Sequence, residues 1–349
     1  MSDAALAPPF IRAHGRTLWL LAAALVAALV LALGSGAVAI PPATVIATLL
    51  GAHDDAQTSL VIWSLRVPRA LLGIIAGAGM GIAGAAMQGL MRNPLADPGL
   101  VGVSSGAALA AAVVVVFGER AMSTGGWAAA ALLPVAAFTG AVLTTALVYA
   151  ASRRNGRSSV TLMLLSGIAI NALALSGIGL LMFMGSDAQI RTFTFWTLGS
   201  VAGATWPGVI AAGCAVGLAL FALSRKAGPL DALALGEAQA AHLGVAVGPL
   251  NRACVVLIAL SVGATTALTG SIGFIGLIAP HVARRLVGPG HRQLLPASAL
   301  AGALLVLLAD SAARTWAAPA ELPIGVLTAL FGAPFFMFLL RRRVGAEGG

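Results

Sequence analysis

The chain has 349 residues, of which 59% are hydrophobic and 9% charged, and its formal net charge is +9. A soluble protein of this length and composition would expose a very large apolar surface, so the composition excludes one. Because lipid offers no partners to free backbone groups, the long apolar runs predict membrane-spanning helices rather than strands. The positive charge is typical of cytoplasmic loops beside anionic lipid and does not indicate nucleic-acid binding.

Ten apolar runs predict an all-α, polytopic membrane protein with about ten transmembrane helices, since each crossing of about 30 Å needs roughly 20 residues. No run is left over for a soluble domain, so residues 1–349 are interpreted as a single transmembrane domain. We expect the spans at about residues 17–40, 61–90, 100–117, 127–150, 160–183, 206–223, 253–270, 272–280, 293–313 and 323–340.

The positive charges set the orientation, because cytoplasmic loops carry the excess of lysine and arginine. With both termini in the cytoplasm, 15 of the 20 lysines and arginines lie inside. These are Arg12, Arg16, Arg92, Arg153, Arg154, Arg157, Arg225, Lys226, Arg252, Arg284, Arg285, Arg292, Arg341, Arg342 and Arg343. The other five, Arg66, Arg69, Arg120, Arg191 and Arg314, are then outside.

Small residues and potential metal ligands are distributed in a way that favours packing over chemistry. The glycine-rich run 77–89 predicts helices whose backbones approach closely. Cys214 and Cys254 lie in apolar runs and are expected to fill space. All five histidines fall in tails, loops or span ends, so the sequence predicts no metal site.

Three of the outer arginines lie at the ends of spans, where two interpretations remain open. Arg66, Arg69 and Arg314 can extend to lipid headgroups, as long basic side chains do. They can also receive carboxylates of a docking protein, because guanidinium groups bind carboxylates in a bidentate manner. Asp310 lies four residues before Arg314, so we expect a structural ion pair within that helix.

The longest cytoplasmic loop, at about residues 224–252, is expected to form two short helices at 230–235 and 237–243. Gly236 breaks them, and Gly244 and Pro249 close the second. The chain contains no G-x-x-x-x-G-K-[ST] phosphate loop, so energy for any transport must come from another subunit. A compact helical element could be the surface that such a subunit grips, although an ordinary connector has the same pattern.

The turn "RNPLADPG" (92–99) contains two X-Pro steps that force extended backbone between two spans. Irregular backbone at a membrane edge must line water or protein. A tight re-entry turn and a gate on a transport path are both compatible with this pattern.

Five ordered motifs make the chain similar to the iron-chelate, haem and cobalamin permease family of bacterial ABC importers. They are residues 66–110, 235–245 ("LGEAQAAHLGV"), 270–288 ("GSIGFIGLIAPHVARRLVG"), 294–310 and 321–342. The resemblance implies an inner-membrane homodimer with a central path, two cytoplasmic ATPase subunits that bind ATP and Mg²⁺, and a periplasmic substrate-binding protein. It implies a transport subunit rather than an enzyme, with no cofactor in this chain.

The same resemblance assigns roles to particular residues. It implies docking of the binding protein at Arg66, Arg69 and Arg314. It places ATPase coupling in the 224–252 loop, where we expect contacts at Leu235, Gly236, Glu237, Ala240 and Leu243. It places a cytoplasmic gate at Asn93, Leu95, Val160 and Thr161.

The expected cargo is a large metal chelate. The outer segment 187–206 resembles haem permeases most, so haem is preferred to a ferric siderophore or cobalamin. An ion-driven secondary transporter is the alternative from another class, but it would need acids or broken helices at mid-membrane, whereas here the charges cluster at membrane ends. A membrane enzyme is a third alternative, although no loop presents a nucleophile with a base.

Overall fold

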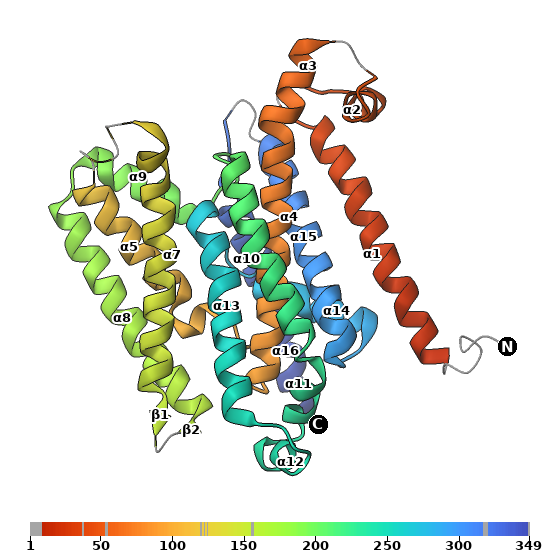
Figure 1. Ribbon diagram of the computed structural model, residues 1–349, viewed down its shortest axis with the longest axis vertical. Coiled ribbons are helices and arrows are strands. Elements are labelled where there is room, and N and C mark those ends of the chain that lie inside the picture. The colour runs from red at the N-terminus through yellow and green to blue at the C-terminus, as the bar shows by residue number, and fades with distance from the viewer. Residues whose placement is uncertain are drawn as a thin grey trace.

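The computed structural model describes residues 9–36, 38–52, 55–118, 121, 123, 125–154, 157–316 and 320–347, which form a helical bundle (Figure 1). Only two two-residue strands, β1 (Arg153–Arg154) and β2 (Arg157–Ser158), interrupt the helices in this part of the chain. The helices are α1 (Pro9–Gly34), α2 (Pro42–Leu49), α3 (Ala56–Leu60), the π-helical η2 (Val61–Arg66), α4 (Val67–Leu90), the 3-10 turn η3 (Pro98–Val101), α5 (Val103–Phe117), α7 (Gly126–Ala151), α8 (Val160–Met184), α9 (Asp187–Leu198), α10 (Trp206–Ser224), α11 (Ala227–Ala234), α12 (Glu237–His242), α13 (Val247–Thr269), α14 (Ile275–Val287), α15 (His291–Trp316) and α16 (Ile324–Glu347).

Seven of the described helices are long and apolar enough to cross a membrane. They are α1, the continuous helix through α3, η2 and α4, and then α7, α8, α10, α13 and α15. The remaining predicted spans coincide with the short helices α5 and α14 and with α16, whose apolar stretch Ile324–Met337 is short. With 13 residues, α14 extends only about 20 Å, too short for a full crossing. The polytopic all-α fold is confirmed, and the count of ten spans is approximate.

Three predicted boundaries are wrong because signals of loops are also signals of helix starts. The segment between the first two predicted spans, 17–40 and 61–90, contains α2, which begins with a proline in its first turn, and α3, which Asp55 caps by accepting backbone N–H bonds. The first span ends at Gly34 rather than near residue 40. At the cytoplasmic end, α13 already begins at Val247, so Pro249 lies in its first turn and does not close the preceding helix.

The centre of the bundle is α4, which packs against α10, α13, α14 and α15. Its glycines allow this, because a Cβ atom on Gly77 or Gly81 would overlap the backbone of α15, and one on Gly84 would overlap the carbonyl oxygen of Gly276 in α14. The predicted close approach of backbones along residues 77–89 is confirmed.

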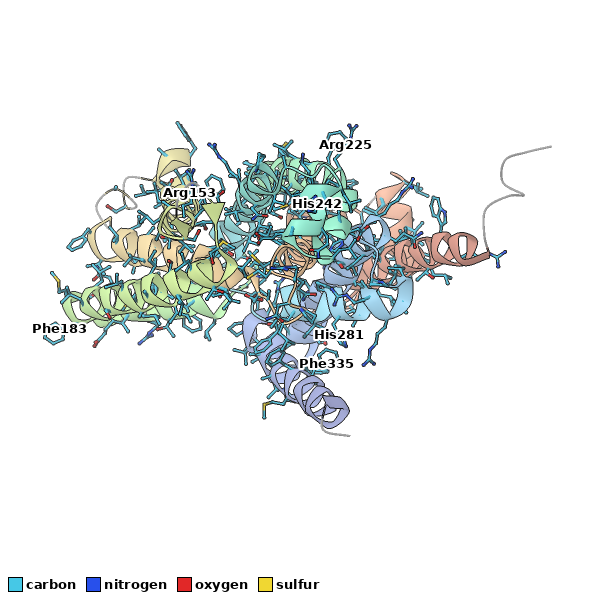
Figure 2. All side chains as sticks on the ribbon, turned by 90° about the horizontal axis from the view of Figure 1, so that it is seen from below. Arg153, Phe183, Arg225, His242, His281 and Phe335 are labelled. Atoms are coloured by element: carbon cyan, nitrogen blue, oxygen red, sulfur yellow. The ribbon has the colours of Figure 1, made fainter. Side chains whose placement is uncertain are left out.

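The other helices surround this centre unevenly. One group consists of α5, α7, α8 and α9, with Gly106 of α5 against Gly140 of α7. On the opposite side α1 packs on α15. Figure 2 shows α16, which carries Phe335, projecting away from the rest of the bundle.

The two ends of the bundle are built differently. One end carries α2, α3 and α9, and the other carries β1, β2, α11 and α12 (Figure 1). The latter end holds basic residues of the predicted cytoplasmic loops, such as Arg153 and Lys226, so it is the cytoplasmic end.

Candidate functional site

The three outer arginines meet in one place although they lie far apart in the sequence. Arg66 ends η2, Arg69 lies in the first turn of α4, and Arg314 lies in the last turn of α15. All three line an outer cavity of about 640 Å³, together with Glu321. The structure therefore brings together every residue of the predicted docking site.

Two acids hold this cluster together. Asp310 is 1% exposed and forms ion pairs with Arg69 at 3.0 Å and with Arg314 at 3.1 Å. The predicted pair within α15 is confirmed, and its sharing with Arg69 was not foreseen. Glu321, which is half exposed, accepts a hydrogen bond from Arg69 at 2.7 Å.

The guanidinium groups of Arg66 and Arg314 also cap the end of α1. The last carbonyl groups of a helix have no partner inside the helix, and basic side chains can satisfy them. Arg66 donates to the carbonyl oxygen of Leu33 at 2.6 Å, and Arg314 donates to those of Ala32 at 3.0 Å and Ser35 at 3.3 Å. These contacts tie α1 to α4 and α15.

This geometry bears on both interpretations of the outer arginines. All three side chains are about nine-tenths buried, so they do not extend freely to lipid headgroups. A partner carboxylate would have to compete with Asp310 and with the α1 carbonyl groups. The arginines therefore have a structural role in this chain, and docking stays a prediction.

The cytoplasmic loop folds into the two predicted short helices, α11 and α12. Gly236 separates them with φ +117°, a conformation that suits glycine, and Gly244 ends the second with φ +83°. Leu235 and Leu243 are each 65% exposed although they lie outside the membrane-spanning helices, which suits a contact surface.

One residue of the predicted coupling contact is in the wrong place. Ala240 is completely buried, because it faces the body of the protein from α12. It supports the helix and cannot touch a partner subunit, so that prediction is wrong for Ala240. The exposed positions Leu235, Glu237 and Leu243 remain available.

The coupling helix is linked to the predicted gate turn by one ion pair. Glu237 of α12 lies 3.9 Å from Arg92, the second residue after α4, and both side chains are partly exposed. Arg92 has φ +50°, which is uncommon for a residue other than glycine and is found preferentially at functional sites. The ion pair therefore joins α12 to the turn that follows α4, and its role in coupling stays a prediction.

The gate turn has its own hydrogen bonds. Asn93 accepts a bond from the N–H of Leu95 at 2.9 Å, and Asp97 accepts one from the N–H of Gly99 at 2.7 Å, which starts η3. Burial raises the pKa of Asp97 above its ordinary value, and the bond from Gly99 opposes this shift.

The second half of the predicted gate lies in the first turn of α8. Val160 and Thr161 follow Ser159, whose hydroxyl accepts the N–H bond of Leu162 at 3.4 Å. The contact between the two halves is made further along, where Gly167 of α8 meets the carbonyl oxygen of Leu100 in η3. The role of the four residues as a gate stays a prediction.

Further polar contacts at the cytoplasmic end were missed by the sequence reasoning. His291, at the start of α15, lies 2.6 Å from Asp231 of α11, and Arg284 of α14 donates to Gln88 of α4 at 2.9 Å. The partners are 60 and 196 residues apart, so no local pattern could have found them. In the described part of the chain, no group of three or more His, Cys, Asp or Glu side chains could hold a metal ion.

Comparison with known proteins agrees with this architecture. The FecCD transport family matches residues 24–342. The hemin transport system permease protein of Yersinia pestis is 41% identical over 82% of this chain and 85% of its own length. A siderophore transport system permease protein of Bacillus subtilis is also 41% identical, over 90% of this chain and 91% of its own.

A solved structure extends the comparison to the fold. It is an inward-facing conformation of an ABC transporter assigned to the metal-chelate type, with a TM-score of 0.81 and 32% identity. The match covers 94% of this chain and 99% of the other. The relatives are transport subunits and not enzymes. The chain belongs to the FecCD transport family and is a multi-pass ABC permease of the bacterial inner membrane.

Proposed function

We propose that this permease imports haem. The observation that supports haem most directly is the likeness to the hemin permease of Yersinia pestis. A second supporting feature is α9 at the outer end, where Arg191 and Phe195 are exposed and lie four residues apart, on one face of the helix. A cation beside an aromatic ring suits a flat, partly apolar chelate that carries carboxylates.

A ferric siderophore or cobalamin is the second candidate cargo for the same architecture. It is favoured by the siderophore permease of Bacillus subtilis, whose identity to this chain equals that of the hemin permease. An ion-driven mechanism is not proposed, because the chain belongs to an ABC permease family and its buried acid Asp310 is held in two ion pairs.

The proposed assembly has two copies of this chain around a central path, a periplasmic binding protein on the outer face and two ATPase subunits on the inner face. The outer cavity lined by Arg66, Arg69 and Arg314 supports docking of the binding protein, because it opens at the outer end and is rich in guanidinium groups. The exposed residues of α11 and α12, such as Leu235 and Leu243, support capture by the ATPase.

The cargo is tested by uptake into proteoliposomes that contain the permease, its ATPase and its binding protein. Haem, a ferric siderophore and cobalamin are supplied separately, each in the same excess over that one binding protein. We expect ATP-dependent accumulation of haem that exceeds that of the other two. Accumulation of only the siderophore or cobalamin would refute haem while leaving the importer intact.

The coupling assignment is tested with Glu237→Arg. We expect lower substrate-stimulated ATPase activity with unchanged membrane insertion, because the substitution places two cations 3.9 Å apart where an ion pair stood. The double variant Glu237→Arg with Arg92→Glu reverses the pair. It should regain stimulation if the pair carries the signal to the gate turn. Unchanged stimulation in the single variant would contradict the assignment.

A further inference from the structure

A groove opens on the cytoplasmic end of the bundle where three helices meet. It lies between the end of α7, the end of α10 and the start of α13, and its volume is about 790 Å³. Its walls combine polar side chains near the helix ends with apolar side chains further along α10 and α13. The lining includes Tyr149, Arg153, Lys226, Arg252, Val256 and Leu257.

Three cations converge on this groove without an acidic partner. In the part of the chain that the structure describes, Arg153, Lys226 and Arg252 form no ion pair. The acids of the neighbouring loop are engaged elsewhere, since Asp231 contacts His291 and Glu237 contacts Arg92. Three like charges around one cavity repel one another, so an anion placed among them would be stabilised.

The apolar wall of the groove indicates which kind of anion binds there. Val256 is 57% exposed and, with Leu257, extends the groove along the membrane-crossing part of α13. A free phosphate would gain nothing from this wall, whereas an acyl chain would cover it. Guanidinium groups bind phosphate oxygens in a bidentate manner, and lysine binds them as a point charge.

The position in the membrane agrees with this ligand. The groove lies at the cytoplasmic end, where the leaflet carries anionic lipids, and basic pockets between helices on that side suit their headgroups. We propose that the groove binds one anionic diacyl phospholipid, with its phosphodiester among Arg153, Lys226 and Arg252 and an acyl chain along Val256 and Leu257. The single negative charge of the bound lipid weakens the repulsion among the three cations, and its acyl chain fills the seam between α7, α10 and α13.

The test uses the full-length permease assembled with its ATPase in phosphatidylcholine nanodiscs, titrated with phosphatidylglycerol. Bound lipid is measured by native mass spectrometry. The variant Lys226→Gln with Arg252→Gln removes two cations from the groove. The matched control, Arg16→Gln with Arg225→Gln, removes two exposed cations of the same end outside it; Figure 2 shows Arg225 at the edge of the bundle.

Each cation beside an anionic headgroup contributes a factor of roughly five in affinity, so the groove variant should bind phosphatidylglycerol about 25-fold more weakly. The control should bind it as the wild type does. Equal losses in both variants, or none in the groove variant, would overturn the proposal. Binding of the lipid by the permease alone but not by the permease assembled with its ATPase would also overturn it, because the cations would then contact the protein partner.

A second variant separates the lipid from a free anion. Val256→Trp fills the apolar wall and leaves the cations in place. We expect weaker binding of phosphatidylglycerol, whereas glycerol 3-phosphate should bind neither the wild type nor this variant measurably. Binding of glycerol 3-phosphate as tight as that of the lipid would show that the acyl chain contributes nothing and would refute the assignment.

Discussion

The buried acid of the outer cluster provides the sharpest test of what holds the periplasmic end together. Asp310→Asn keeps the size of the side chain and removes its charge. Asp310 is 1% exposed and pairs with both Arg69 and Arg314. Removing one partner of a buried ion pair leaves an uncompensated charge and costs roughly 3–5 kcal/mol. We therefore expect the free energy of unfolding to fall by about that amount.

The neighbouring acid is the matched control. Glu321 also pairs with Arg69, at 2.7 Å, but its side chain is 51% exposed. Exposed ion pairs contribute about 0–1 kcal/mol, because water screens them and the side chains lose entropy. Glu321→Gln removes the same charge from the same partner, so we expect a loss several times smaller than that of Asp310→Asn.

The two variants are compared by reversible unfolding of the purified permease in mixed micelles with increasing sodium dodecyl sulfate. The position of α1 is followed by the reactivity of a cysteine introduced at Ser35, which accepts a bond from Arg314. Asp310→Asn should raise this reactivity, since Arg314 loses its counter-charge. Equal losses of stability in Asp310→Asn and Glu321→Gln, or losses below 1 kcal/mol in both, would refute the reasoning from burial.

Two further predictions concern packing and pH. Gly84→Ala should destabilise the bundle by roughly 1–3 kcal/mol or more, because its Cβ would overlap a backbone oxygen of α14. The control is Gly217→Ala, whose Cβ would face open space. This variant should be neutral or stabilising in the same unfolding assay. Burial raises the pKa of Asp97, so the contribution of this one group to stability is fully present below the ordinary aspartate pKa of about 4 and is lost as the pH rises through the raised value. The melting temperature is measured against pH in the wild type and in Asp97→Asn, and the variant should lack this loss of stability. The same loss in both proteins would contradict the prediction.

The features that the sequence predicts well depend on local pattern and on the membrane itself. Hydropathy locates the helices because each crossing needs a minimum apolar length, and the sidedness of arginine and lysine sets their direction. The glycine spacing in residues 77–89 predicts close packing because small residues are what permits it. Gly236 predicts the break between α11 and α12 because its positive φ suits glycine.

The features that it misses depend on partners far away in the chain. Arg66 looks like a residue at the rim of a span, yet it donates to Leu33, 33 positions earlier. Arg314 reaches Ala32 across 282 positions. The sequence places Ala240 in the short helix that is expected to contact the ATPase subunit. Only the packing of α12 on the body of the protein shows that Ala240 is buried. In each case the residue type can be read from the sequence, whereas its contact partner is known only from the folded structure.

The two ends of the permease differ in the burial of the ion pairs that join their helices. At the outer end, Asp310 joins α4 to α15 through buried ion pairs whose disruption costs roughly 3–5 kcal/mol. At the inner end, the coupling helix is joined to the gate turn by the exposed pair of Glu237 and Arg92, which contributes about 0–1 kcal/mol. The ion pair between α12 and the predicted gate turn is therefore weaker than the buried outer cluster.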